Sequence, residues 1–269
     1  MTSDCLLIEK EPPIVWLKLN RPKVANALNS ELLTALLNAT NIIATDNHIA
    51  VVAIIGAGSK FFCAGADLTE RKNMTEAQVI DYHLLIQKTM DSLESLPQPV
   101  IAAINGCAYG GGTELALACD LRVMVKDASL RLPEVKLGII PGAGGTQRLP
   151  RLIGKSKAKE MIFTGSPLTA QEGFQYGLIN KLVSEQPDLE ETFHTPLINF
   201  VSSWAKEIAQ AAPLSLRQAK LAINAGYDKN LSDGLAIETK AYLKLINTKD
   251  RLEALKAFAE KRNPKFIGE

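Results

Sequence analysis

Two kinds of apolar pattern alternate along most of the chain. Short continuous apolar runs, such as 51–55 (VVAII) and 100–104 (VIAAI), are typical of strands that are buried on both faces of a sheet. Between them, leucines and isoleucines recur at helical spacing, which predicts amphipathic helices from about Asn29 to Ala44 and from Thr75 to about Leu96. Thr75 and Gln78 have the spacing of a capping box at the start of the second helix. The apolar face of this second helix is expected to consist of Ile80, Leu84, Leu85 and Leu93.

Shorter patterns indicate further elements. Apolar runs predict strands at 14–19 and 121–125, and helical spacing predicts short helices at 155–164 and 169–176. The acidic segment 184–195 is expected to be a surface loop. Beyond it nearly the whole sequence has helical spacing, and helices are expected at about 200–212, 214–225, 232–245 and 249–261.

Strands therefore give way to helices near residue 195. This change predicts two parts, a core domain of residues 1–195 and a helical region of residues 196–269. Alternating strands and helices place the core in the α/β class, although periodicity does not distinguish an open doubly wound sheet from a spiralling one. With 269 residues, the chain is long enough to bury roughly three quarters of the surface that it exposes when unfolded.

Composition and charge argue against several classes of protein. Hydrophobic residues make up 46% of the chain and charged residues 22%, and the formal net charge of +1 does not suit a dedicated nucleic-acid or membrane-surface protein. No apolar run approaches the ~20 residues needed to cross a bilayer. The N-terminus resembles neither a secretory signal nor a transit peptide. We therefore expect a soluble protein of the cytoplasm, or a processed form in the mitochondrial matrix if the source is eukaryotic.

Neither a metal site nor a nucleotide cofactor is indicated. The cysteines, at positions 5, 63, 107 and 119, lack C-x-x-C spacing, and the histidines lack the spacing of metal ligands, so we expect buried, reduced thiols and no metal. Two glycine-containing segments, Gly56-Ala57-Gly58 and Gly154-Lys155-Ser156, lack the further glycines of dinucleotide-binding and phosphate-binding loops.

Candidate chemistry gathers in one stretch in the middle of the chain. Three glycines, Gly110 to Gly112, precede Glu114 at the start of an expected helix, and Glu134 stands in a loop ahead of a second glycine cluster. Glycines at a helix entrance let backbone N–H groups bind a developing oxyanion, and the Gly65-Ala66 turn could present a second N–H. The two carboxylates could act as general acid and base, or each could be an ordinary structural glutamate. Because no Ser/His/Asp set is evident, the pattern favours a proton-transferring lyase or isomerase over covalent catalysis.

Four motifs resemble those of the enoyl-CoA hydratase (crotonase) superfamily. They are 19–22 (LNRP), 62–68 (FCAGADL), 105–120 (NGCAYGGGTELALACD) and 133–148 (PEVKLGIIPGAGGTQR). The resemblance covers nearly the whole chain. It implies a spiral of ββα units, followed by a C-terminal helical region that builds homotrimers, often paired into hexamers.

The resemblance also implies roles for individual residues. The backbone N–H groups of Ala66 and Gly111 would form an oxyanion hole for the thioester carbonyl. Glu114 and Glu134 would be the catalytic pair: one activates water for attack at C3, and the other helps to hold that water and supplies the proton to C2. Gly142 would help to seat this site. Contacts with the substrate and its CoA portion are implied for Arg21, Lys23, Ala64, Ala66, Asp67, Leu68, Gly111 and Gly142.

Two departures from the family pattern are informative. Thr69 stands where many hydratases carry a lysine near the CoA, so Arg21, Lys23, Arg71 or Lys72 would have to serve instead. One member of the family's methylglutaconyl-CoA hydratase branch binds AU-rich RNA through a lysine-studded first helix, whereas 26–44 contains neither Lys nor Arg here. Because binding to phosphates needs positive charge, we expect no nucleic-acid partner.

Because both glutamates are present, the resemblance implies hydration of a trans-2-enoyl-CoA to a 3-hydroxyacyl-CoA, with no cofactor beyond the CoA carried by the substrate. Runs such as 139–142 (IIPG), 219–224 (AKLAIN) and 249–253 (KDRLE) look closest to the methylglutaconyl-CoA hydratase branch. That branch would suggest 3-methylglutaconyl-CoA as substrate, and the pathways that the resemblance implies are fatty-acid β-oxidation and leucine degradation. The alternatives are an enoyl-CoA isomerase of the same fold and a non-catalytic, RNA-linked member.

Overall fold

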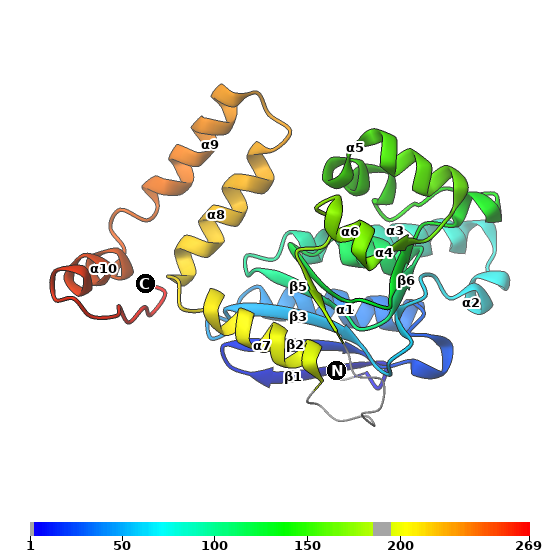
Figure 1. Cartoon of the computed structure of the whole chain (residues 1–269), viewed down its shortest axis with the longest axis horizontal. Helices are drawn as coiled ribbons and strands as arrows, with labels where there is room; N and C mark the ends of the chain where they lie inside the picture. The colour runs from blue at the N-terminus through cyan, green and yellow to red at the C-terminus, as the bar shows by residue number, and fades with distance from the viewer. Residues whose placement is uncertain (1–2, 185–194) are drawn as a thin grey trace.

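Two β-sheets lie at the centre of the fold (Figure 1). The computed structural model describes residues 3–184 and 195–269. The larger sheet has six strands in the order β1 (Leu6–Glu11), β2 (Ile14–Leu19), β3 (Val51–Gly56), β5 (Val100–Ile104), β7 (Leu121–Val125) and β10 (Lys181–Val183). The smaller sheet has four strands in the order β4 (Phe61–Cys63), β6 (Cys107–Tyr109), β8 (Ser129–Arg131) and β9 (Leu168–Thr169).

The chain winds between the two sheets as a spiral. Successive turns each give one strand to the larger sheet and the next strand to the smaller one: β3 and β4, then β5 and β6, then β7 and β8. Strands of neighbouring turns pair in parallel in both sheets, and β1 and β9 join in antiparallel orientation. The turns continue into α3 (Glu76–Glu94), α4 (Gly111–Leu117) and α5 (Gly145–Thr164). The predicted α/β class and spiral of ββα units are thus confirmed.

The predicted strands all belong to the larger sheet. Every residue of β3 and β5 is buried, as the continuous apolar runs indicate. The sequence does not reveal β1, which is an edge strand with mostly exposed side chains, or the strands of the smaller sheet. These last strands have only two or three residues each, which is too short for any periodicity to develop.

The two predicted amphipathic helices are present. Asn29 caps α1 (Ser30–Ile43) by accepting from the Leu32 N–H, and α3 begins with the predicted capping box of Thr75 and Gln78. The predicted apolar face of α3 is partly wrong. The side chains that it buries are Tyr82, Ile86, Thr89, Met90 and Leu93, whereas Ile80 and Leu84 are 53% and 54% exposed. The side of α3 that carries Tyr82 faces the core, so Ile80 and Leu84 lie on the side that faces solvent.

The predicted helix at 155–164 is the second half of a longer helix. Helix α5 already begins at Gly145, and Gly154, with φ 79° and ψ 156°, interrupts it. Glycine adopts this conformation without a Cβ clash, so the helix bends there and then continues. The other predicted short helix is α6 (Ala170–Gln175).

The C-terminal region is helical, as predicted. It consists of α7 (Pro196–Ile208), α8 (Pro213–Gly226), α9 (Leu231–Leu243) and α10 (Lys249–Ala259). Helix α7 lies along the larger sheet and buries Leu197, Val201 and Ala205 in the same core as the strands. Helices α8 and α9 form a hairpin that extends from the body, with α10 beyond it (Figure 1). We call α8 to α10 the arm. The arm begins after α7, whereas the change from strand-forming to helix-forming sequence lies before α7.

The expected surface loop at 184–195 lies almost entirely outside the described residues. Within the described ranges, no helix combines the length and the apolar character that crossing a membrane requires.

Candidate active site

The run Gly110–Gly112 brings helix α4 against the smaller sheet. Gly110 adopts a φ of 52°, which favours glycine, and a Cβ added to Gly112 would lie 2.0 Å from the carbonyl oxygen of Cys63 in β4. Helix α4 therefore starts in direct contact with β4.

The turn after β4 meets the start of α4. A Cβ on Gly65, whose φ is +91°, would lie 2.9 Å from the nitrogen of Gly111, and a Cβ on Gly111 would lie 3.6 Å from the nitrogen of Ala66. Leu28 forms a parallel bridge with Ala66, in which Leu28 N–H donates to the Gly65 carbonyl at 2.7 Å and Asp67 N–H donates to the Leu28 carbonyl at 3.0 Å. Because alternate residues of an extended segment face opposite sides, the N–H of Ala66 points away from Leu28. Tertiary contacts thus bring together the two backbone groups that the sequence suggests as oxyanion donors.

Glu114, on α4, is only 3% exposed. Its Oε1 accepts hydrogen bonds from the backbone N–H groups of Ala143 at 2.7 Å and Gly145 at 2.8 Å. Gly145 is the first residue of α5, so the carboxylate caps a helix N-terminus, where the helix dipole favours negative charge. Burial raises the pKa of Glu114, and the two N–H donors oppose this rise because they bind the ionised form.

Glu134 has a different environment. It begins the short 3-10 helix η2 (Glu134–Leu137), where the sequence suggested only a loop, and its exposed fraction is 8%. A Cβ on Gly110 would lie 3.0 Å from Glu134 Oε1, so the carboxyl group faces the glycine turn. Its Oε2 has no hydrogen-bond partner among the described residues. Burial, and less strongly the charge of Glu114, raise the pKa of Glu134 to about 7.

Gly142 is held against α3. Gln87 Nε2 donates to its carbonyl oxygen at 2.9 Å, and a Cβ on Gly142 would lie 2.8 Å from Cε1 of His83. The next residue, Ala143, donates its N–H to Glu114. Gly142 therefore belongs to the segment that holds this carboxylate.

Two predicted CoA contacts, Arg21 and Asp67, bind each other. Arg21 Nη2 lies 2.9 Å from Asp67 Oδ2, and Arg21 Nη1 donates to the Ala27 carbonyl at 2.5 Å. Asp67 also caps α2 (Leu68–Lys72) by accepting from the Thr69 N–H at 3.1 Å. The ion pair thus fixes the backbone next to Ala66. A direct contact of either side chain with CoA stays a prediction.

The other predicted contacts surround the same turn. Ala64 is half-buried and its N–H donates to the Ala25 carbonyl at 2.9 Å, while Leu68, the first residue of α2, is 55% exposed. Thr69 and Lys72 are exposed on α2, and Arg71 is half-buried. These side chains surround the Ala66 turn at the surface.

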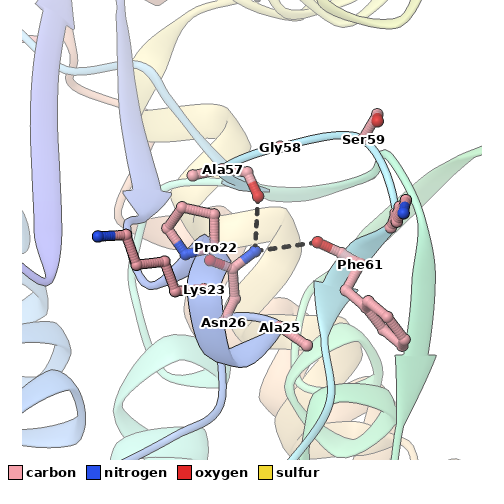
Figure 2. Close-up of a pocket in the computed structure, with 9 residues that line it drawn as sticks. Pro22, Lys23, Ala25, Asn26, Ala57, Gly58, Ser59 and Phe61 are labelled. Atoms are coloured by element: carbon pink, nitrogen blue, oxygen red, sulfur yellow. Dashed lines mark hydrogen bonds between the residues drawn. The ribbon is translucent and has the colours of Figure 1, made fainter.

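Lys23 lines a cavity of about 370 Å³ next to this region (Figure 2). Lys60 lines it as well, so two lysine residues border the space. Asn26, which the sequence analysis did not single out, is fully buried there and has a φ of 54°. Its Nδ2 donates to the carbonyl oxygens of Ala57 and Phe61 at 2.9 Å each (Figure 2). Asn26 thus ties the segment after β2 to the β3–β4 loop.

The thiols are packing groups. Cys5, Cys63 and Cys119 are buried and unpaired, as expected, whereas Cys107 is half-buried. Burial raises the pKa of Cys63 and of Cys119 to about 12, so both thiols stay protonated at neutral pH. In the described part of the chain, no group of His, Cys, Asp and Glu could hold a metal ion.

The family model for enoyl-CoA hydratase/isomerase matches residues 9–269. The chain belongs to this enoyl-CoA hydratase/isomerase family. The superfamily suggested by the sequence motifs is confirmed, and enzymes of this crotonase fold act on acyl-CoA thioesters. A crystal structure of enoyl-CoA hydratase from Bacillus anthracis superposes with a TM-score of 0.93 at 48% sequence identity, covering 98% of this chain and 100% of that chain.

Relatives of the family have several names. Methylglutaconyl-CoA hydratase of Mus musculus is 44% identical over 263 residues, which cover 98% of this chain and 82% of the mouse protein. Enoyl-CoA isomerase/hydratase fer4 of Mycosarcoma maydis is 42% identical, and the match covers 95% of this chain and 93% of that protein. Family membership therefore leaves hydration and isomerisation both open.

Proposed function

We propose that this member of the family hydrates a trans-2-enoyl-CoA to a 3-hydroxyacyl-CoA. The observation that carries the proposal is the unlike environment of two buried carboxyl groups. Glu114 is held by two backbone N–H groups at a helix N-terminus, whereas Glu134 has one oxygen without a partner in the described ranges and a pKa raised to about 7. A hydratase needs one group that accepts a proton from water and one that gives a proton to carbon. The two N–H donors favour the ionised form of Glu114, whereas burial favours the neutral form of Glu134, and such a pair of unlike carboxyl groups meets both needs.

The oxyanion hole would consist of the N–H groups of Ala66 and Gly111. Attack of water at C3 pushes an electron pair through C2 onto the thioester oxygen, and an enolate forms. Two convergent N–H groups, one of them at the N-terminus of α4, would stabilise that oxygen as its charge grows. The contact between the Gly65 and Gly111 turns supports this assignment.

Glu114 is proposed as the base and Glu134 as the acid. A carboxylate of Glu114 takes a proton from water while the water oxygen bonds to C3. Protonated Glu134 then gives its proton to C2, and the enolate collapses to the saturated thioester. A pKa of about 7 keeps a substantial fraction of Glu134 protonated near neutral pH, which suits a donor. Proton exchange with solvent restores both groups.

The test is hydration of crotonyl-CoA in isotopically labelled water. Disappearance of the enoyl-thioester absorbance together with a labelled oxygen at C3 of the product is the expected result. An isomerase shuttles a proton between C2 and C4 and incorporates no oxygen. This second candidate is favoured by the similarity to fer4, an enoyl-CoA isomerase/hydratase. Double-bond migration in 3-enoyl-CoA without label would contradict the hydratase proposal.

3-Methylglutaconyl-CoA is proposed as the specific substrate. The support is the mouse relative of that name, which matches 98% of this chain at 44% identity. A panel of short, long and branched enoyl-CoAs tests it, because the proposal requires the highest kcat/KM for the branched, carboxylated acyl group. A higher value for unbranched crotonyl-CoA would reject this substrate and leave hydration itself intact.

The CoA phosphates are proposed to lie near Lys23. Lys23 and Lys60 border the cavity, whereas Arg21 is engaged by Asp67. Lys23→Gln should raise KM with little change in kcat, since the phosphates do not react. The matched control is Lys18→Gln on β2. Ala64, Leu68 and Gly142 are also proposed to contact the substrate. Ala64 and Leu68 flank the Ala66 turn, and Gly142 precedes the residue that donates to Glu114.

A homotrimer or a dimer of trimers is proposed for the assembly. The arm supports self-association, because large apolar side chains such as Leu231, Tyr242 and Phe258 are 78%, 64% and 86% exposed. Light scattering of the full chain is expected to give three or six copies, and Phe258→Glu is expected to favour smaller species. A monomer at micromolar concentration would contradict this proposal.

A further inference from the structure

An arginine lies behind the turn that binds Glu114. The side chain of Arg148, in the first turns of α5, is 14% exposed. On one side, its Nη2 lies 2.8 Å from Asp91 Oδ1 and 2.6 Å from Glu94 Oε2, and its Nε donates to the same Glu94 oxygen at 3.1 Å. On the other side, its Nη1 donates to the carbonyl oxygen of Ala143 at 3.0 Å. A single side chain thus joins the end of α3 to the turn before α5.

The turn itself presents opposite faces to Arg148 and to Glu114. The N–H groups of Ala143 and Gly145 donate to Glu114 Oε1 at 2.7 and 2.8 Å, while the Ala143 carbonyl between them accepts from Arg148. Gly144 has a φ of +105°, and a Cβ there would lie 2.0 Å from Arg148 Nη1. The guanidinium therefore fills the space beside the turn and determines which way the peptide between Ala143 and Gly144 points.

We propose that Arg148 is a positioning residue for Glu114. It holds 143–145 so that two N–H groups point at the carboxylate, and its positive charge favours the ionised carboxylate. The kinetic consequence rests on the proposed function, in which Glu114 is the base. The effect on ionisation does not depend on that function.

The charges around Glu114 set the direction of the effect. Arg148 is the cation that lowers the pKa of Glu114, and Glu134 on η2 is the carboxyl group that faces it. Arg148 is itself faced by the two α3 carboxylates, Asp91 and Glu94, whereas the nearby Cys119 thiol stays neutral. Removing the charge of Arg148 should therefore raise the pKa of Glu114. Removing the charge of Glu94 should lower it, because the guanidinium is then less neutralised.

A purely structural link between α3 and α5 predicts a different pattern. Arg148→Met and Glu94→Gln both break that link, so both would loosen the turn and shift the pKa of Glu114 in the same direction. Opposite shifts in these two variants therefore exclude a purely structural link, and the kinetics of Arg148→Lys test the positioning itself.

The experiment is a pH titration by NMR of the full chain with ¹³C at the glutamate carboxyl carbons. The signal of Glu114 is identified by its loss in Glu114→Gln. We expect its pKa to rise in Arg148→Met, to stay near the wild-type value in Arg148→Lys, and to fall in Glu94→Gln. Arg151→Met is the matched control, because Arg151 lies on the same helix and pairs with Asp228 on the arm side instead. Shifts of the same sign in Arg148→Met and Glu94→Gln, or no shift in either, would overturn the proposal.

If Arg148→Met does not fold, Glu94→Gln decides, because an unchanged or raised pKa of Glu114 in that variant contradicts the proposal.

Hydration kinetics add a second measurement. Arg148→Lys keeps the charge but loses the forked contact, so kcat should fall about tenfold or more with little change in KM. The acid limb of the pH profile, where the rate rises as Glu114 ionises, should not shift in this variant. Arg148→Met should also move that limb to higher pH. If the wild-type protein hydrates no enoyl-CoA, the proposed function fails while the titration still decides on Arg148.

Discussion

Arg21 and Asp67 form an ion pair, with 2.9 Å between Nη2 and Oδ2, directly beside the proposed oxyanion donor Ala66. Burial raises the pKa of Asp67, but the hydrogen bonds from Arg21 and from the N–H groups of Glu70 and Thr69 outweigh it and hold the pKa below its usual range. The pair is therefore linked to the stability of the turn as well as to its shape.

Asp67→Asn should destabilise the protein in a pH-dependent way. Because the folded-state pKa is lowered, the stabilisation is complete above the unfolded-state value of about 4 and is lost as the pH falls through the folded-state value. We expect a loss of roughly 1–3 kcal/mol at neutral pH and a smaller loss in acid. Urea unfolding at both pH values measures it, with Asp81→Asn, on the exposed side of α3, as control. Equal losses at the two pH values would contradict the linkage.

Glu114→Gln and Glu134→Gln should each lower kcat for hydration by about 10²–10⁴ with little change in KM. Amides keep the shape of the side chains but can neither accept a proton from water nor donate an acidic one. The decay of enoyl-thioester absorbance measures the rate, and Glu160→Gln, exposed on α5, serves as control. Full activity of Glu134→Gln would rule out the mechanism with two glutamates.

The pH profile of kcat/KM should fall as the pH rises through about 7, the raised pKa of Glu134 in the free protein. Its folded-state pKa lies above the unfolded-state value, so ionisation disfavours the folded state. The free energy of unfolding should therefore decrease as the pH rises from the unfolded-state value towards about 7. Glu134→Gln should remove this part of the decrease, and chemical unfolding at several pH values tests it. An alkaline limb well above that range would show that another group controls the rate.

Gly112→Ala should destabilise the protein by about 1–3 kcal/mol or more. The added Cβ would lie 2.0 Å from the Cys63 carbonyl oxygen, which is part of β4 and cannot move aside cheaply. Gly234→Ala, inside α9, is the matched control, because its Cβ would lie 3.8 Å from its nearest neighbour, the Gly226 carbonyl oxygen of α8. There alanine should be neutral, or more stable by up to about 1 kcal/mol, because it favours a helix. Thermal unfolding compares the two, and similar stabilities would refute the close approach of α4 and β4.

Local sequence predicts the buried strands of the larger sheet well, although not its edge strand β1. The runs at 51–55 and 100–104 are continuous and apolar, so a strand buried on both faces is the simplest structure for them. The caps at Asn29 and Thr75 are also local, since each side chain binds a backbone N–H three residues away. Ile80 and Leu84 show the limit of local prediction. Helical spacing predicts an apolar stripe on α3, but the packing of neighbouring elements decides which edge of that stripe is buried.

The residue types of the candidate site were also visible in the sequence, in the glycines at 110–112, the Gly65-Ala66 turn and the two glutamates. The unlike environments of those glutamates were not. Glu114 is bound by the N–H groups of Ala143 and Gly145, which two strands, β7 and β8, and the helix η2 separate from it along the chain. Asn26 and Arg148 went unnoticed for the same reason, since their partners lie far away in the sequence.

The sequence by itself determined the family motifs, the apolar runs that become strands, and the acid and base candidates, because each of these depends on residue type and short-range spacing. The tertiary structure alone decided that the Ala66 and Gly111 N–H groups lie together and that Glu134 Oε2 has no partner in the part of the chain that the structure describes. It also decided that Arg148 supports the turn at Glu114. These are consequences of burial and of contacts between successive turns of the spiral, and both arise only when distant segments pack.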